Sequence, residues 1–250
     1  MFSLEKEQLF IGMPIPLKET ICLVYPLTAL EIFKLTQTQY NYYLNLLILE
    51  EEDLKEIYKK KNIELEENIS PFTYILRSCE YDSNFLLDIK KAFFTFIRER
   101  VQILPEDKVI IVGDLKDKRI IDEEAFYELQ QILRLQNGIE PEEEIPEDEN
   151  EMQKKFRLRR KELKKAKKKQ AQKNIDEDNS IDFYCMVKAL LIKKIINYEE
   201  LNKITLYAIH ELFTILQAEE EYNNGIKFLC AGADPKKNKI TYWIRKTYDK

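Results

Sequence analysis

A block of opposite charges interrupts the chain after residue 138 and limits what can fold as one unit. Residues 140–151 hold two prolines and a dense run of acids, and residues 154–173 hold twelve Lys or Arg side chains against one acid, Glu162. The basic stretch alone sums to +11, so the rest of the chain sums to −16 within a total of −5. Such charged runs have too few apolar residues to bury a core. We therefore interpret residues 139–179 as an acidic-then-basic linker.

The residues on both sides of this linker have the composition of a helical protein. The chain has 250 residues, of which 44% are hydrophobic and 34% charged, and only 5 are Gly. Scarce Gly together with many Leu, Ile, Lys and Glu residues favours helices over a turn-rich β fold. We expect a mainly α protein with a few short β-strands, in which residues 1–138 form an α+β domain and residues 180–250 a small helical domain with a basic tail.

Capping residues and turns predict the elements of the first domain. Thr28 with Glu31 three residues later has capping-box spacing, and apolar residues follow at helical spacing up to Ile48. Further helices are expected to begin at Ser70-Pro71, at Asp82 or Ser83, and at Asp122, the last ending at Asn137-Gly138. Short apolar runs predict a strand pair or extended arm from residues 9–11 and 21–25, and a β-hairpin from residues 108–112 and 119–121.

The second domain has the periodicity of three helical segments. Apolar residues recur at helical spacing over residues 183–191, a short helical turn is expected at 198–201, and a longer helix begins at Thr205. This last helix either continues through Gly225 or restarts after it, and Gly232 ends it.

Residues that could carry enzymatic chemistry are few. The single histidine, His210, lies in an apolar-periodic helix without a partner motif, which is typical of a helix-surface or boundary residue. The four cysteines, Cys22, Cys79, Cys185 and Cys230, are far apart and lack zinc-site spacing. Phosphate-binding glycine loops and nucleophile elbows are also missing from the sequence. We therefore expect no enzyme activity, no cofactor and no metal.

The location of the protein is predicted from its termini and apolar runs. The first ten residues lack a basic region followed by a long apolar one, so no secretory signal is expected. No stretch reaches the roughly 18–20 apolar residues that a transmembrane helix needs. We expect no membrane contact and a place in the cytoplasm of a cell.

Partner binding is the function that the remaining patterns favour. Cations of the basic stretch, represented by Arg157, Arg159, Arg160, Lys164 and Lys165, could contact a protein partner or neutralise the phosphates of a nucleic acid. Phe156 is the only aromatic residue in this stretch, which argues against stacking on single strands.

Three aromatic residues are also candidates for partner contacts. Tyr40 and Tyr43 belong to a helix with aromatic residues on more than one face, so one of its tyrosines could be exposed. Trp243 lies in a polar, basic tail, where it either anchors a partner or packs back on the C-terminal helices.

Several short stretches, taken in order, resemble tail-module proteins of phages that infect low-GC Gram-positive bacteria, a group placed with tail-assembly chaperones. The stretches are 21–28 (ICLVYPLT), 31–32, 42–44, 119–122 (RIID), 126–129 (FYEL), Asn137, 197–200 (NYEE), 204–212 (ITLYAIHEL), 231–232 and 242–244 (YWI). His210 departs from this pattern. The resemblance implies a helical factor that binds tail components such as the tape-measure protein in the host cytoplasm, and it implies no catalytic residues.

Two other functions stay open beside this one. The protein could be a structural subunit of the virion tail or baseplate, or a nucleic-acid-associated protein that uses residues 154–173. The sequence also leaves self-association open.

Overall fold

The structure, a computed structural model, describes residues 6–50, 53–55, 57–58, 69–114, 119–139, 152, 155, 159, 182–234, 240 and 242–244. Over these residues the chain is mainly helical with two small antiparallel sheets, which confirms the predicted fold class. Most of the predicted linker, residues 139–179, lies outside the described residues. The helices are α1 (Lys6–Ile11), α2 (Ala29–Leu35), α3 (Gln37–Leu47), α5 (Pro71–Tyr81), α6 (Ser83–Ile97), α7 (Glu123–Gln136), α9 (Phe183–Ile192), η2 (Tyr198–Asn202, a 3-10 helix) and α10 (Leu206–Cys230).

Helix starts lie where the capping residues predicted them. Thr28 and Glu31 form a complete capping box at the start of α2, in which each side chain bonds the other residue's backbone N–H. Asp82 accepts hydrogen bonds from two backbone N–H groups of the first turn of α6. Ser70, Asp122 and Thr205 accept in the same way at the starts of α5, α7 and α10. These side chains satisfy N–H groups that have no partner within the helix itself.

A break between α2 and α3 is not visible in the apolar spacing of the sequence. Thr36 has a φ of 75°, a backbone conformation that the side chain of a threonine disfavours, and its hydroxyl accepts from the N–H of Gln39. The chain therefore turns at Thr36, and α3 starts in a new direction.

The N-terminal strand pair differs from the prediction. Residues 9–11, expected to belong to a strand pair or extended arm, are part of α1, which ends at Ile11 and is followed by Gly12 with a φ of +77°. Its apolar run was too short to distinguish a helix from a strand by periodicity. The two strands that do pair are β1 (Ile15–Leu17) and β2 (Cys22–Val24), each with two buried residues around an exposed one.

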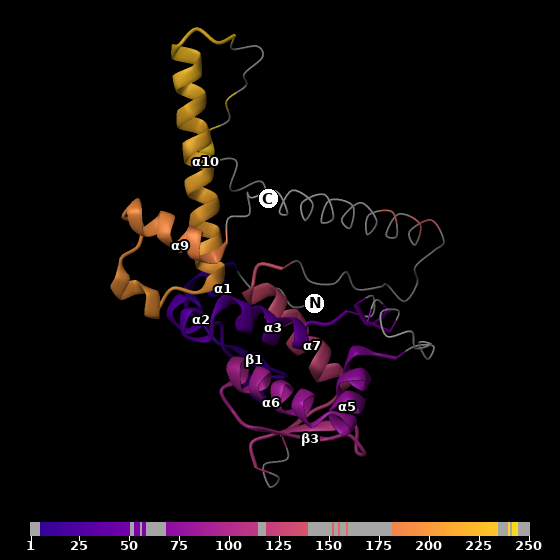
Figure 1. Ribbon diagram of the computed structural model, residues 1–250. Coiled ribbons are helices and arrows are strands. Elements are labelled where there is room, and N and C mark those ends of the chain that lie inside the picture. Colours follow the sequence, from indigo (N-terminus) through magenta and orange to yellow (C-terminus); the bar gives the residue numbers. More distant parts are fainter. Residues whose placement is uncertain are drawn as a thin grey trace.

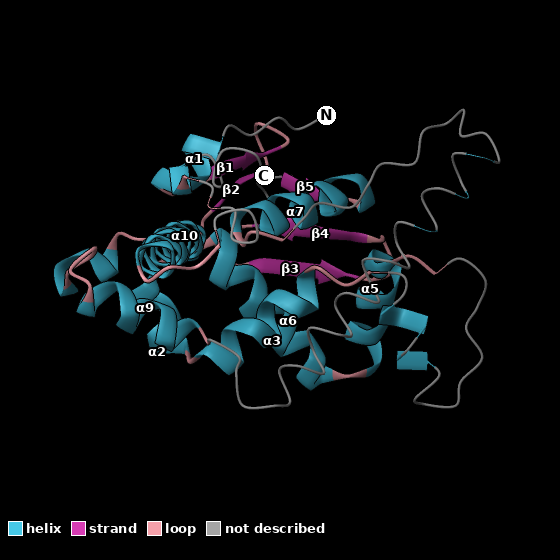
Figure 2. Ribbon diagram, turned by 90° about the horizontal axis from the view of Figure 1, so that it is seen from above, coloured by secondary structure: helices cyan, strands magenta, loops and turns pink. Residues whose placement is uncertain are grey.

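The second sheet contains the predicted hairpin and one further strand. β4 (Val109–Val112) pairs with β5 (Arg119–Ile121), as expected, and β3 (Val101–Leu104) adds to the other edge of β4. The resulting order is β3-β4-β5. In Figure 1 this sheet forms the base of the molecule, with α5 and α6 directly above it, and Figure 2 shows the three strands from above.

The C-terminal helices pack against the N-terminal part of the chain. The backbone N–H of Ala29 donates to the carbonyl of Ile204 at 2.9 Å, and Thr28 forms an isolated antiparallel bridge with Thr205. The ring of Phe183 on α9 lies 5.4 Å from that of Phe33 on α2. Buried residues of α9 and α10 accordingly belong to the same apolar core as those of α2, α3, α6 and α7.

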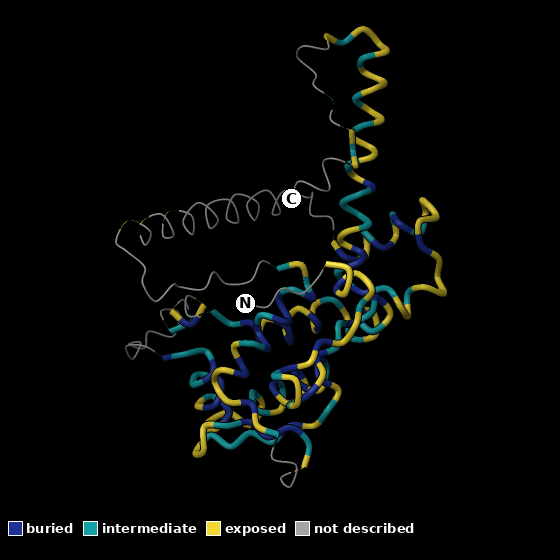
Figure 3. Tube along the Cα trace, turned by 180° about the vertical axis from the view of Figure 1, so that it is seen from behind, coloured by how far each residue is buried: buried dark blue, intermediate teal, exposed yellow. Residues whose placement is uncertain are grey.

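α10 extends beyond this core. The helix is continuous through Gly225, which decides between the two predicted alternatives. Its first half carries the buried residues, and its second half projects away from the remaining helices and is mainly exposed (Figures 1 and 3).

Candidate interaction surface

Tyr40 and Tyr43, two of the predicted partner contacts, are core residues. They are only 3% and 4% exposed, whereas Tyr42 between them is 45% exposed. The Tyr40 hydroxyl donates to the side-chain oxygen of Asn137, and burial raises the pKa of Tyr40. Because α3 lies with these two rings toward the core, neither can contact a partner without unpacking. Tyr42 is the outward tyrosine, and its hydroxyl donates to Asp88 at 3.0 Å.

Trp243 lies half-buried in a tail that folds back along α10. Its ring is 5.9 Å from that of Tyr242, which meets Tyr222 of α10 edge-on at 5.4 Å. Ile240 approaches Gly225 so closely that a Cβ there would lie 3.0 Å from its Cδ1. The neighbours of Trp243 therefore lie against α10, and the two roles of Trp243 itself, partner anchor or packing on the C-terminal helices, stay predictions.

Of the basic stretch 154–173, the structure describes only residues 155 and 159. Arg159 is exposed, and Arg157, Arg160, Lys164 and Lys165 lie outside the described residues. Their predicted contacts with a protein or nucleic acid stay predictions.

His210 lies at a small cavity between the N-terminal and C-terminal helices. The cavity has a volume of about 230 Å³ and is lined by Ile32, Gln37, Tyr40, Asn41, Asp182, Phe183, Met186, Leu206 and His210. Burial lowers the pKa of His210, and the charge of Glu211 opposes this shift. Asp182 is engaged elsewhere, because its carboxylate accepts from the N–H of Cys185 at 2.7 Å as the N-cap of α9.

In the part of the chain that the structure describes, the cysteines and acids form no metal centre. Among the described residues, no group of three or more His, Cys, Asp and Glu side chains is placed to hold a metal ion. All four cysteines are free; Cys22 and Cys79 are buried, and Cys185 and Cys230 are exposed.

Exposed apolar side chains concentrate where α9 meets η2. Ile192 is 69% exposed, Ile195 41% and Tyr198 79%. We call these residues, with Leu191 and the adjoining turn 193–197, the α9–η2 corner. Apolar side chains gathered on a surface in this way are typical of an interaction site. No helix in the part of the chain that the structure describes is long and apolar enough to cross a membrane.

The backbone of the corner is held by its own hydrogen bonds. Lys194 adopts a left-handed conformation with a φ of 58°, which turns the chain at the end of α9. The N–H of Ile195 then donates to the carbonyl of Leu190 at 3.0 Å. Asn197 and Glu200 form a second capping box, with side chain to backbone distances of 3.1 and 2.7 Å. The corner is therefore shaped before any partner arrives.

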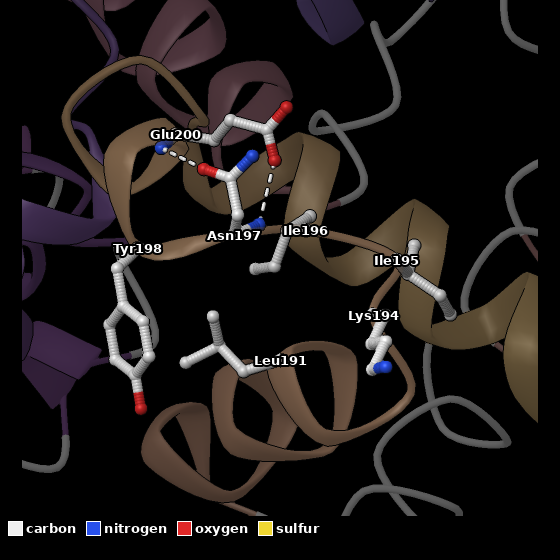
Figure 4. A pocket seen from close by; sticks show the side chains of 7 residues that line it. All are labelled: Leu191, Lys194, Ile195, Ile196, Asn197, Tyr198 and Glu200. Carbon is white, nitrogen blue, oxygen red and sulfur yellow. Dashed lines mark hydrogen bonds between the residues drawn. The ribbon is translucent and has the colours of Figure 1, made fainter.

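A hollow of about 520 Å³ opens in this corner (Figure 4). Its lining consists of Leu191, Lys194, Ile195, Ile196, Asn197, Tyr198 and Glu200. In Figure 4 the side chains of Leu191 and Ile196 face each other across the hollow, with Tyr198 on one side and Lys194 on the other. Apolar walls with one cation at the edge can accept an apolar side chain that has a carboxylate near it.

The sequence of α9 itself indicates this surface. α9 (FYCMVKALLI) is apolar on nearly all sides, yet only Phe183, Val187 and Leu190 are buried. A helix of this kind is expected to be surrounded by protein. Tyr184 and Ile192, which remain outside the inward stripe, indicate a face that needs a further partner.

The corner lies in the part of the chain for which a related domain is known. Residues 167–248 are similar to the YomV second domain. YomV is a protein of the Bacillus prophage SPβ, so this similarity supports an association with phages. The matched region is about one third of the chain. No curated protein and no solved structure matches the chain.

Proposed function

We propose that this protein is a non-enzymatic phage tail-assembly factor that binds helical tail components, such as a tape-measure protein, through the α9–η2 corner. The observation that carries the proposal is the exposed apolar surface of this corner, which lies inside the region similar to a prophage protein domain. The tail role itself comes from the sequence resemblance.

The physical argument rests on the free energy of exposed apolar area. Burying such area is favourable by about 25 cal/mol per Å², so a folded corner that leaves three large side chains in water is available to bind. Because hydrogen bonds within the corner already fix its backbone, the corner loses little conformational entropy on binding. A partner helix with an apolar stripe has the complementary surface.

Co-expression with the tape-measure protein and its tail neighbours tests this proposal. An affinity pull-down of the full chain should recover a tail protein at low and at high salt, since apolar contacts are not screened by ions. Recovery of no tail protein under either condition would contradict the proposal. Presence of the chain in purified virions would instead favour a structural subunit of the tail or baseplate.

The charge of residues 154–173 favours a second function, in which the protein associates with nucleic acid. Twelve cations in twenty residues can release several counterions from a phosphate backbone, and such binding weakens steeply with salt. Deleting these residues should abolish any nucleic-acid binding and leave tail-protein binding intact. Recovery of nucleic acid alone, lost at high salt, would favour this second function.

A further inference from the structure

We propose that the hollow of the α9–η2 corner binds one face of an acidic amphipathic helix, with an apolar side chain between Leu191 and Tyr198 and a carboxylate beside Lys194. This inference rests on the proposed function, since it specifies the chemistry of the partner that the corner recognises. The partner helix belongs to another protein, the tail component.

The apolar part of the hollow accounts for the first requirement. Ile196 is 6% exposed, Leu191 is half-buried and Tyr198 is 79% exposed. The solvent exposure of the lining therefore increases from Ile196 to Tyr198. An aromatic ring that stands in solvent beside a preformed apolar floor is typical of a residue that dominates binding energy. A leucine or phenylalanine side chain that enters the hollow would bury the ring of Tyr198 and the aliphatic side chain of Leu191.

The polar lining accounts for the second requirement. The carboxylate of Glu200 accepts from the N–H of Asn197, and in Figure 4 it lies beyond Asn197 as seen from Leu191. The neighbouring Lys193 is paired with Glu220 of α10 at 2.5 Å. The Lys194 ammonium, in contrast, has no hydrogen bond or ion pair with another of the residues that the structure describes. A partner carboxylate would complement it.

A helix suits this hollow better than a small molecule does. Sites for small molecules use several convergent polar groups, whereas the free polar group here is one flexible ammonium at the edge. A helix presents side chains three and four residues apart on one face, which can supply an apolar group and a carboxylate together. The rest of the hollow can then accommodate the next apolar residue of the stripe.

Two defined peptides test the chemistry without a known partner. Both are helices of about 18 residues with leucine at every seventh position; one carries Glu and the other Lys at the position four residues after each leucine. Binding to the full chain is followed by fluorescence anisotropy. We expect Tyr198→Ala to weaken binding of the acidic peptide about tenfold, and Lys194→Glu to shift the preference between the peptides about fivefold toward the basic one.

Matched controls separate the hollow from the basic stretch 154–173, which attracts acidic peptides by charge alone. Lys188→Glu changes the net charge as Lys194→Glu does, at an exposed position of α9 outside the hollow, and Tyr81→Ala removes an exposed tyrosine of α5. Neither control should alter binding by more than about twofold. Equal behaviour of Lys194→Glu and Lys188→Glu, or unchanged binding in Tyr198→Ala, would overturn the inference.

The pull-down with the tail proteins distinguishes this inference from the proposed function. If Tyr198→Ala and Lys194→Glu recover the tape-measure protein as well as the unmodified chain does, the inference about the hollow is contradicted and the proposed tail function is supported. If the peptides respond as expected but no tail protein is recovered, the inference about the hollow is supported and the tail function is contradicted.

Discussion

A guanidinium group lies buried where α7 meets the C-terminal end of α3. Arg134, which is 4% exposed, donates to the carbonyl of Ile48 and to the carboxylate of Glu50, both at 2.9 Å. Gln130, one turn earlier, donates to the carbonyls of Leu47 and Leu49. The last carbonyls of a helix have no partner inside it, so these two side chains of α7 complete the end of α3.

Replacing Arg134 with Met should destabilise the fold strongly. The substitution leaves a buried carbonyl without its donor and a carboxylate without its cation, which we expect to lower the free energy of unfolding by about 2–3 kcal/mol. Urea denaturation followed by circular dichroism measures this change. The control Lys91→Met removes a side chain that is 53% exposed. A loss no greater than that of the control would show that Arg134 is not needed there.

The four thiols should differ in reactivity because of burial and hydrogen bonding. Burial raises the pKa of Cys22 and of Cys79 to about 12, so both stay protonated near neutral pH. The hydrogen bond to Asp182 raises the pKa of the exposed Cys185 thiol, which also lowers its thiolate fraction.

Labelling of the folded chain with a thiol reagent at about pH 8 should therefore modify Cys185 and Cys230 first, and Cys22 and Cys79 only after unfolding. Asp182→Asn should accelerate labelling of Cys185 severalfold, since the carboxylate that holds its proton is gone. Peptide mapping by mass spectrometry identifies the sites. Early labelling of Cys22 or Cys79 in native conditions would contradict their buried positions.

At the scale of elements, we expect the second half of α10 to depend on the contacts that Ile240 and Tyr242 make with it. An isolated stretch of helix in water is marginally stable, so contacts from Ile240 and Tyr242 are expected to support it. Gly225 makes this possible, because its missing side chain leaves room for Ile240.

Gly225→Leu should displace the tail without unfolding the core. Trp243 is the only tryptophan, so its fluorescence reports the tail directly, and we expect its emission to move to longer wavelength as the ring enters water. Asn224→Leu, at an exposed position of the same helix, serves as the control. An unchanged spectrum in Gly225→Leu would show that the tail does not depend on this approach.

Elements were predictable where a local chemical rule fixes them. Asp82 and Asp122 cap helices regardless of what surrounds them, so α6 and α7 could be placed from the sequence. β3 was missed because a four-residue strand is specified by its partner β4 rather than by its own residues. The orientation of α3, which buries Tyr40 and exposes Tyr42, likewise depends on packing that no single segment encodes.

The same distinction applies to the candidate site. The sequence indicates aromatic and basic residues as partner contacts by their type alone. The α9–η2 corner, in contrast, exists because the N-terminal helices leave part of α9 uncovered. The left-handed turn at Lys194, which shapes the hollow, has no sequence signature, because Lys does not favour that conformation.

At the scale of the whole molecule, we expect the junction between the N-terminal and C-terminal helices to determine how the chain unfolds. Phe183 is 4% exposed and packs on Phe33, and backbone hydrogen bonds join residues 27–29 to residues 204–206. We expect a single cooperative thermal transition that includes both parts. The division into two domains at residues 139–179 is tested by the same measurement.

Phe183→Ala should lower the stability of the whole chain. Truncation of a buried phenylalanine typically costs about 3–5 kcal/mol, and a shared core should move the entire transition to lower temperature. Differential scanning calorimetry measures this, with the exposed Phe228→Ala as the control. Two separate transitions, of which only one moves, would instead show that the two parts fold independently.

The left-handed backbone at Lys194 lowers stability, and under the proposed binding of an acidic helix we expect its side chain to be retained for recognition. A side chain in this conformation costs about 1 kcal/mol, which glycine would avoid and asparagine would reduce. Random libraries at this codon should thus diverge under different selections: heat challenge alone should enrich Gly or Asn, whereas selection for binding of the acidic helical peptide should retain Lys. Recovery of Gly under both selections would mean that the ammonium has no role in binding this peptide.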